Sequence, residues 1–243
     1  MDRAALHRLA QALPDIPRWV ETRSMLLSGR CEVFGIEEGE DLSFVVRDAE
    51  DVLISVVGRP GRDAIEEAIV REREGDVIIT PPENGPHVAA ALPDWRAVLV
   101  TQHLLDDADQ LPRVPAGTVR WLEEPELASV SGLPPALLSE LQLATRSSPI
   151  ATGLEGGRPV SFCYAASQTE SLWDIAINTL EGYRNRGHAA RCVAYIVEHM
   201  RCQSKTPVWG AEEWNRASLG LAAKLGFVPV DELIVFHPPH DQR

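Results

Sequence analysis

The sequence predicts a mixed α/β fold, of the α+β type with a mixed sheet, and three observations carry this prediction. Residues 172–179 alternate in polarity and are rich in β-branched side chains, as in a half-buried strand. Directly downstream, apolar residues recur at helical spacing, namely Val193, Ile196, Val197 and Met200. The same order of strands, a helix and further strands occurs in the first half of the chain. An α/β arrangement is therefore expected in both halves.

The elements of the N-terminal half follow from local patterns. Residues 1–13 mix charged residues with Leu and Ala, which indicates an amphipathic helix and not a secretion signal. Arg62 to Arg73 is predicted to be a helix, because Ala64, Ile65, Ala68 and Ile69 form an apolar stripe. Short apolar runs predict strands at residues 31–36, 42–46, 52–57, 77–80 and 96–101.

A domain boundary is predicted near residue 112. Pro and Gly residues at 111–117 follow the acidic run 106–109, which indicates an exposed linker. We therefore expect an N-terminal α/β lobe at 1–112 and a second domain at 113–243. In the first lobe, residues 58–61 have the position of a phosphate-binding turn, but Pro60 removes one N–H donor. This lobe is either a degenerate copy of the second domain or an unrelated α/β cap.

A Gly-containing turn joins the predicted strand at 172–179 to the predicted helix. Such a turn presents unpaired backbone N–H groups and the positive end of the helix dipole. Arg184, Arg186 and Arg191 crowd this turn, although the formal net charge of the chain is −13. The turn from Arg184 to Ala189 is therefore predicted to bind an anion such as a diphosphate.

A second strand and helix follow the first pair. Residues 207–211 are predicted to form a short buried strand. Asn215 can cap the next helix, and Gly226 is placed to end it. Two further strands are expected at 227–230 and 233–236.

These motifs, in this order, resemble those of the GCN5-related N-acetyltransferase (GNAT) superfamily over roughly Val114 to Phe236. Arg184-x-x-Gly187-x-Ala189 is similar to the family's diphosphate loop, and Asn215-x-x-Ser218 followed by Leu225-Gly226-Phe227 is similar to its second cofactor motif. The resemblance implies a GNAT fold in the C-terminal half. It implies acetyl-CoA or another acyl-CoA as co-substrate, with no metal. A tandem of one active and one decayed lobe is similar to the glycine N-acyltransferase-like members.

The resemblance also implies which residues bind the cofactor. In this fold the fourth and fifth strands splay apart, and the pantetheine amides pair with the fourth strand as an added strand would. The implied residues are Ile177, Asn178 and Thr179 along the strand, Arg184, Asn185, Arg186, Gly187, His188 and Ala189 around the diphosphate, and Asn215 and Ser218 along the thiol arm. Two alternatives stay open: Asn215 acts only as a helix cap, and Ser218 is only a tolerated small residue.

The catalytic groups are less determined by the sequence. An amine acceptor must lose a proton before it attacks a thioester, and a carboxylate can accept that proton. Asp174, on the predicted strand at 172–179, is the first candidate, and Glu212, after the predicted strand at 207–211, is the second. Glu170 and Glu213 are further options. Alternation does not decide whether Asp174 faces the site, faces solvent or pairs with an Arg. Many family members carry a Tyr acid where this chain has Ala222. The thiolate then leaves unassisted or uses another donor.

Composition restricts the other classes of function. Apolar residues make up 44% of the 243, which is ample for a core, and no apolar run approaches the ~20 residues that cross a bilayer. The acidic balance argues against a nucleic-acid partner. The four Cys lack metal-binding spacing and predict reduced thiols in a cytoplasmic protein. His237 and His240 are expected in a solvated tail.

The predicted function is that of an N-acetyltransferase, which transfers acetyl from acetyl-CoA to a primary amine by direct attack within a ternary complex. The expected partners are acyl-CoA and a small-molecule or peptide amine, and a homodimer stays open. One alternative is a non-catalytic CoA-binding or regulatory module. Another is an interaction protein in which both lobes are scaffold.

Overall fold

The computed structural model describes the chain except for residues 38–41, 70–74, 128–129, 131 and 240–243. Its elements form two compact units. Unit 1 comprises Met1–Gln102, Gly210–Arg216 and the chain from Pro229 onward, and unit 2 comprises His103–Trp209 and Ala217–Val228. Three strands are divided between the units, namely β5 (Arg96–Leu105), β10 (Thr206–Glu212) and β11 (Phe227–His237).

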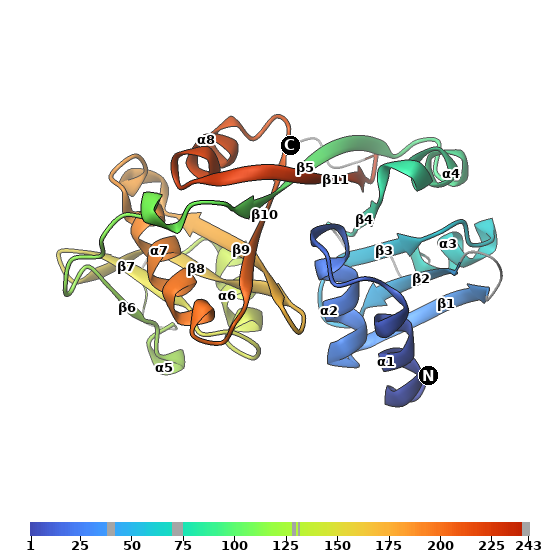
Figure 1. Ribbon diagram of the computed structural model, residues 1–243, viewed down its shortest axis with the longest axis horizontal. Coiled ribbons are helices and arrows are strands. Elements are labelled where there is room, and N and C mark those ends of the chain that lie inside the picture. The colour runs from blue at the N-terminus through green and yellow to red at the C-terminus, as the bar shows by residue number, and fades with distance from the viewer. Residues whose placement is uncertain (38–41, 70–74, 128–129, 131, 240–243) are drawn as a thin grey trace. The chain divides into compact units, whose positions relative to one another are not determined.

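Unit 1 is a mixed sheet with helices (Figure 1). Strands β1, β2 and β3 form an antiparallel meander, and α3 then leads to β4, which runs parallel to β3. The C-terminal part of β11 pairs antiparallel with β4. The elements are α1 (Arg3–Ala12), η1 (Pro17–Trp19), α2 (Val20–Ser28), β1 (Cys31–Glu37), β2 (Ser43–Asp48), β3 (Leu53–Val57), α3 (Arg62–Ile69), β4 (Val77–Thr80), η2 (Pro82–Asn84) and α4 (Gly85–Ala91).

The alternation of apolar residues along β2 explains why this sheet is covered on both faces. Phe44 and Val46 pack in a cluster with α1 and α2, whereas Val45 packs in a second cluster with α3 and α4. Successive side chains of a strand point to opposite faces, so a run of apolar residues requires helices on both sides. Asp2 caps α1 by accepting a hydrogen bond from the Ala5 amide at 2.7 Å.

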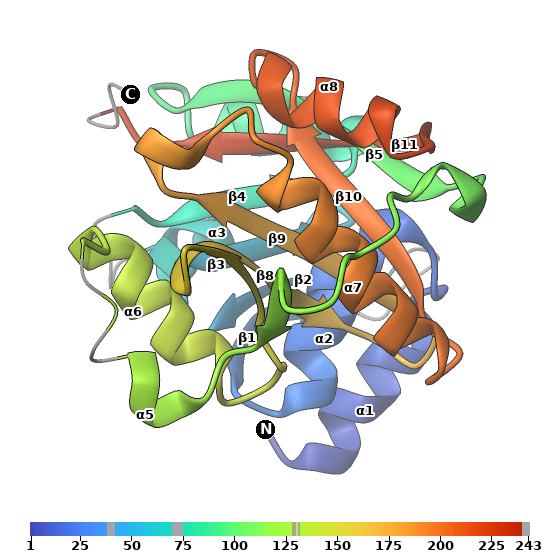
Figure 2. The same cartoon turned by 90° about the vertical axis from the view of Figure 1, so that its left-hand side faces the viewer.

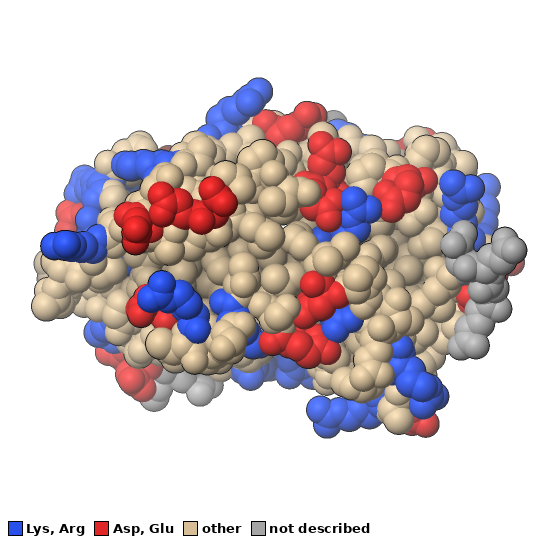
Figure 3. All heavy atoms as spheres, in the orientation of Figure 1, with Lys and Arg blue, Asp and Glu red and all other residues tan. Residues whose placement is uncertain are grey.

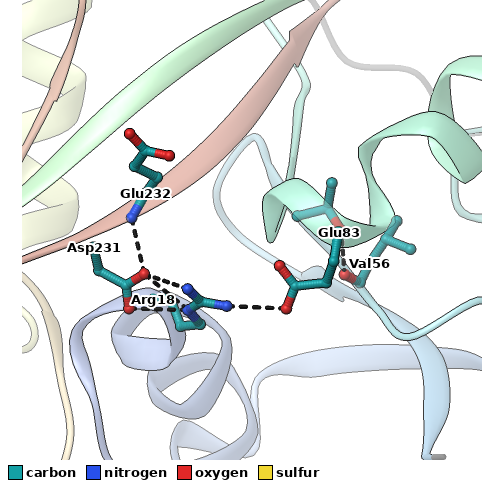
Figure 4. A network of polar contacts seen from close by, with 6 residues as sticks. Arg18, Val56, Glu83, Asp231 and Glu232 are labelled. Atoms are coloured by element: carbon teal, nitrogen blue, oxygen red, sulfur yellow. Dashed lines mark hydrogen bonds and ion pairs between the residues drawn. The ribbon is translucent and has the colours of Figure 1, made fainter.

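The last strand differs from the prediction. Residues 227–230 and 233–236 were expected to be two strands, but Phe227–His237 form one strand, β11. Asp231 and Glu232, which lie between the two predicted strands, are residue types that are depleted in strands. In the structure the Asp231 carboxylate instead accepts hydrogen bonds from Arg18 Nε at 2.9 Å, and Arg18 Nη1 also binds Glu83 Oε1 at 2.9 Å (Figure 4). This ion pair compensates for an acidic residue inside the strand.

Unit 2 repeats the order of elements found in unit 1. Each unit has helices, then three antiparallel strands, a helix, a strand parallel to the third, a helix and a last strand. Strand β6 pairs with β7 in addition. The elements are η3 (Ala108–Gln110), β6 (Val119–Trp121), α5 (Glu124–Leu127), α6 (Pro135–Ala144), β7 (Ala151–Glu155), β8 (Arg158–Gln168), β9 (Leu172–Thr179), η4 (Glu181–Tyr183), α7 (His188–Arg201) and α8 (Arg216–Lys224).

Helices α6 and α7 flank the strands β8 and β9 (Figure 2). Phe162 and Tyr164 of β8 belong to the cluster that contains α6, whereas Cys163 points the other way, toward Cys192 of α7. The apolar face of α7 is buried, including the predicted Val193, Ile196, Val197 and Met200. This packing fixes where the first turn of α7 lies relative to β9.

The prediction of a mixed α/β fold is confirmed. The predicted strands at 77–80 and 172–179 agree with β4 and β9, and the strands at 31–36, 42–46, 52–57, 96–101 and 207–211 differ from those observed only at their ends. The predicted helix at 62–73 is observed as α3 to Ile69, and its remainder lies outside the described residues.

Acidic and basic side chains are interspersed on the face shown in Figure 3.

Candidate functional site

Strand β9 extends beyond its pairing with β10. The two strands are parallel, and their pairs run from Leu172–Thr206 to Asp174–Val208. Beyond Asp174, β9 continues to Thr179 and remains paired with β8 on its other edge. Among the described strands, β10 therefore does not pair with residues 175–179 of β9. The backbone N–H and C=O groups on that edge of β9 are available to an extended ligand.

The chain leaves β9 through a tight turn and enters α7. Asn185 and Gly187 both have left-handed backbone conformations, with φ of 61° and 77°. Gly187 is the N-cap of α7 and has no side chain to bind the first-turn N–H groups. Arg184, Asn185, Arg186 and Gly187 are exposed, and Ala189 is half-buried. The turn thus presents backbone donors at the positive end of a helix dipole.

A series of polar side-chain contacts holds the turn against β7 and the first turn of α7. His188 is buried, and its Nε2 lies 2.7 Å from Glu155 Oε2 on β7. Arg186 Nη1 donates to the other carboxylate oxygen of Glu155 at 2.6 Å. Arg191 Nη2 lies 3.0 Å from His188 Nδ1. Since an arginine only donates and a carboxylate only accepts, these contacts fit a neutral His188 with its proton on Nε2.

The environment of Glu155 stabilises its charged form. The hydrogen bond from His188 lowers the pKa of the Glu155 carboxyl below its ordinary value, and the positive charge of Arg186 acts in the same direction. The sequence indicated neither this side-chain contact of His188 nor the role of Glu155.

The other basic side chains also contact the turn itself. Arg184 Nε donates to the Thr179 carbonyl at 3.3 Å. The guanidinium of Arg186 lies over the Tyr183 ring, 5.5 Å from its centroid. The Tyr183 ring therefore packs against the turn.

The predicted β9 residues differ in their surroundings. Asp174 is half-buried and stands at the last β10 pair. Ile177 is half-buried, and Asn178 Nδ2 donates to Glu140 Oε1 of α6 at 3.1 Å. Thr179 Oγ1 lies 2.8 Å from Ser161 Oγ of β8. The side chains of Asn178 and Thr179 are thus used within unit 2, which leaves their backbone groups as candidates for ligand contacts.

Two of the predicted residues belong to unit 1. Glu212 Oε1 lies 3.0 Å from His237 Nε2, and Glu212 Oε2 accepts a hydrogen bond from the Trp214 indole. The backbone N–H of Asn215 donates to the Glu212 carbonyl at 2.9 Å. His237 was expected in a solvated tail, but it ends β11 with its side chain largely buried. His240 lies outside the described residues.

In α8, two positions are occupied by core contacts. Ser218 Oγ accepts a hydrogen bond from the indole of Trp209, a buried residue, at 2.9 Å. Ala222, which has the position of the family's Tyr, is completely buried. The Ser218 hydroxyl therefore supports the packing of unit 2, whatever else it contacts.

Neither a metal cluster nor a membrane span is found in the parts of the chain that the structure describes. No three His, Cys, Asp or Glu side chains there come together as metal ligands. None of the described helices combines the length and apolar character of a bilayer-spanning segment.

The open edge of β9, the Gly187 turn and α7 define the class of this domain. Residues 152–236 match the model of the GNAT acetyltransferase family. The segment from β7 to β11 is therefore similar to a GNAT acetyltransferase domain. A search of curated proteins gives no match.

Solved structures share this fold at low sequence identity. A GCN5-related N-acetyltransferase-like protein from Streptococcus suis has a TM-score of 0.69 at 18% identity, with 97% of each chain covered. A GNAT-family protein from Novosphingobium aromaticivorans, described as a putative acetyltransferase, has a TM-score of 0.64 at 16% identity, with 91% of this chain and 96% of that chain covered. A tandem GNAT protein from the clavulanic acid biosynthesis pathway has a TM-score of 0.57 at 14% identity, with 96% and 92% covered.

Proposed function

We propose that this protein is an acyl-CoA-dependent N-acyltransferase that transfers acetyl from acetyl-CoA to a primary amine by direct attack within a ternary complex. The observation that carries the proposal is the Gly187 turn, which opens α7 directly beyond the open edge of β9. The diphosphate of CoA is assigned to residues 184–189, and the pantetheine amides are assigned to the β9 backbone from Ile177 to Thr179.

The residues present suit this ligand. A diphosphate needs several N–H donors and positive charge, and the exposed turn supplies both. Gly187 places no side chain at the turn, and a Cβ there would lie 3.1 Å from Arg191 Nη1. CoA supplies the acyl group as a thioester.

Asp174 is proposed as the group that takes the proton from the amine. It stands where the β9–β10 ladder ends, next to the segment assigned to pantetheine. The amine nitrogen then forms the new bond to the acyl carbon as the carbon–sulfur bond breaks, and CoA leaves as a thiolate that takes up the second proton of the nitrogen. Glu212 is the less favoured base, because both of its oxygens already contact His237 and Trp214. Asn215 and Ser218 stay proposed contacts of the thiol arm.

The N-terminal lobe, residues 1–112, is proposed to be a degenerate copy of the domain at 113–243. The repeated order of elements and the tandem protein among the similar structures support this. The turn after β3 is occupied by its own contacts: the Arg59 amide donates to Ser43 Oγ at 3.0 Å, and the Pro60 carbonyl contacts His87 Nε2 at 2.7 Å. We propose that only the second domain binds CoA.

The placement is tested by the affinity of Arg186→Glu for CoA. A carboxylate beside the diphosphate, and beside Glu155, should weaken binding by at least about tenfold through like-charge repulsion. Arg186→Gln should have a smaller effect, and Arg201→Gln, at the exposed far end of α7, should have none. Calorimetric titration with CoA measures all three. An Arg186→Glu affinity equal to that of the natural protein would contradict the placement.

A non-catalytic CoA-binding module is the second candidate. It is favoured by Ala222, which is buried and offers no acid, and by the contacts that occupy Glu212. It predicts CoA binding without turnover. A mass-spectrometric screen of amines with acetyl-CoA and longer acyl donors separates the candidates, since only an enzyme releases free thiol when an amine is added.

A further inference from the structure

A small basic cavity adjoins the Gly187 turn within unit 2. It has a volume of about 250 Å³ and lies between the start of α7, the linker after η3 and the end of α8. Three cationic side chains line it, one from each of these elements: Arg191, Arg113 and Lys224. None of its described lining residues is acidic. Such a concentration of positive charge is unusual in a chain with a net charge of −13.

These cations are available to a ligand. Arg113 and Lys224 are exposed, and neither forms an ion pair or hydrogen bond within the described chain. Arg191 contacts His188 through Nη2, but its Nε is buried and makes no hydrogen bond to the described residues. A buried donor without a partner costs free energy unless a ligand or water supplies an acceptor. The cavity therefore suits an anion with several oxygens.

We propose that this cavity binds the 3′-phosphate of CoA, so that Arg113, Arg191 and Lys224 make the protein discriminate CoA from dephospho-CoA. This inference rests on the proposed function, because it takes the diphosphate to lie at the adjoining turn. The 3′-phosphate and the diphosphate are attached to the same ribose. Gly187 belongs to both the turn and the cavity wall, so one nucleotide can reach both.

The turn and the cavity differ in the donors that they offer, and this difference agrees with assigning the diphosphate to the turn and the 3′-phosphate to the cavity. The diphosphate is matched by the N–H groups of the turn and by Arg186. A phosphomonoester carries about −1.5 to −2 charges at neutral pH and three acceptor oxygens, and it pairs best with more than one cation. Arg113 and Lys224 lie outside the turn and are not needed for the diphosphate, so they are assigned to this second group.

The test is a calorimetric comparison of CoA and dephospho-CoA on the full chain. The natural protein is expected to bind CoA at least about tenfold more tightly than dephospho-CoA. Lys224→Gln and Arg113→Gln should each weaken CoA binding by about tenfold and leave the affinity for dephospho-CoA unchanged. Arg201→Gln, a matched exposed cation of α7 outside the cavity, should change neither affinity.

The outcomes separate this inference from the proposed function. Equal affinity of the natural protein for the two ligands overturns the 3′-phosphate assignment but leaves CoA binding intact. An equal loss of both ligands in the Lys224 and Arg113 variants overturns it too, because the side chains would then act on the diphosphate. If the natural protein binds neither ligand, the proposed function fails as well. The comparison on the natural protein needs no variant to fold.

Discussion

Glu155 and His188 lie 2.7 Å apart, the carboxylate at the end of β7 and the imidazole at the first residue of α7. Because Glu155 also holds Arg186, one carboxylate ties the start of the helix and a turn arginine to the sheet. The turn that the proposed function assigns to the diphosphate is thus positioned before any ligand arrives. Such pre-organisation reduces the entropy that binding must overcome.

The first prediction concerns the pH dependence of stability. The folded-state pKa of Glu155 is lowered, so the stability that its charged form contributes is present above the ordinary value of 4.5 and is lost as the pH falls through the lowered folded value. Glu155→Gln should melt below the natural protein at pH 7, and the difference should shrink below pH 4.5. Thermal unfolding from pH 7 to acid measures this. Glu198→Gln, which removes an exposed carboxylate of α7, is the control, and parallel curves for Glu155→Gln and the natural protein would refute the prediction.

Gly187 gives a second prediction. Its φ of 77° is unfavourable for residues with a Cβ, and an added Cβ would lie 3.1 Å from Arg191 Nη1. Gly187→Ala should destabilise unit 2 by about 1–2 kcal/mol and weaken CoA binding. Gly182→Ala is the matched control, since a Cβ there meets no atom within 4 Å and its φ is not positive. Denaturant unfolding and CoA titration give both readouts, and equal behaviour of the two variants would count against the role of the turn.

Local patterns were sufficient for the parts of the site that are continuous in sequence. Residues 172–179 and the start of α7 could be predicted because alternation, a Gly turn and a helical stripe each have a short-range cause. The contacts that fix the turn come from elsewhere in the chain. Gly156-Gly157 is a hairpin signal that could have located β7 and β8. No local pattern shows that Glu155 faces His188.

Contacts between residues distant in sequence also explain why the structure near the C-terminus differs from the prediction. The predicted break between residues 230 and 233 was wrong, and the pairing of Asp231 with Arg18, distant in sequence, gives no local signal. The contact between His237 and Glu212 was missed for the same reason. The boundary between 1–112 and 113–243 stays a prediction. In the contacts of the structure, Gly210–Arg216 and the chain from Pro229 onward group with the N-terminal unit.

Asp174 allows a test of the proposed proton transfer. Asp174→Asn keeps the size of the side chain but removes the base, so the turnover number should fall by about 10²–10⁴. CoA affinity should be unchanged, because the diphosphate and pantetheine are assigned to other groups. Glu170→Gln, an exposed carboxylate shortly before β9, is the control. A loss of turnover in the control but not in Asp174→Asn would move the base to Glu170.

The four cysteines should differ in reactivity. Burial raises the pKa of the Cys192 thiol to about 12 and that of Cys31 to about 11, and it raises that of the completely buried Cys163 as well. Cys202 is exposed. Since the thiolate is the nucleophile, iodoacetamide at pH 8 should modify Cys202 first and reach Cys163 and Cys192 only on unfolding. Peptide mass spectrometry over time checks this order. Early modification of Cys192 would mean that α7 opens readily.

The last prediction concerns a buried ion pair in unit 1. Arg47 Nη2 lies 2.7 Å from Asp76 Oδ2, the two side chains are 3% and 1% exposed, and Arg47 Nη1 also donates to the Ala68 carbonyl. Removing one partner leaves a charge in a site that water does not reach. Arg47→Met and Asp76→Leu should therefore each cost about 3–5 kcal/mol of unfolding free energy. The double variant should cost clearly less than their sum, because neither charge is then left without its partner. Denaturant unfolding of the natural protein, the two single variants and the double variant completes this double-mutant cycle. Arg62→Met and Glu66→Leu, which remove an exposed ion pair of α3, are the matched control. Each should change the free energy of unfolding by about 0.5 kcal/mol or less. Additive losses in the buried pair would show that Arg47 and Asp76 do not stabilise each other's charge.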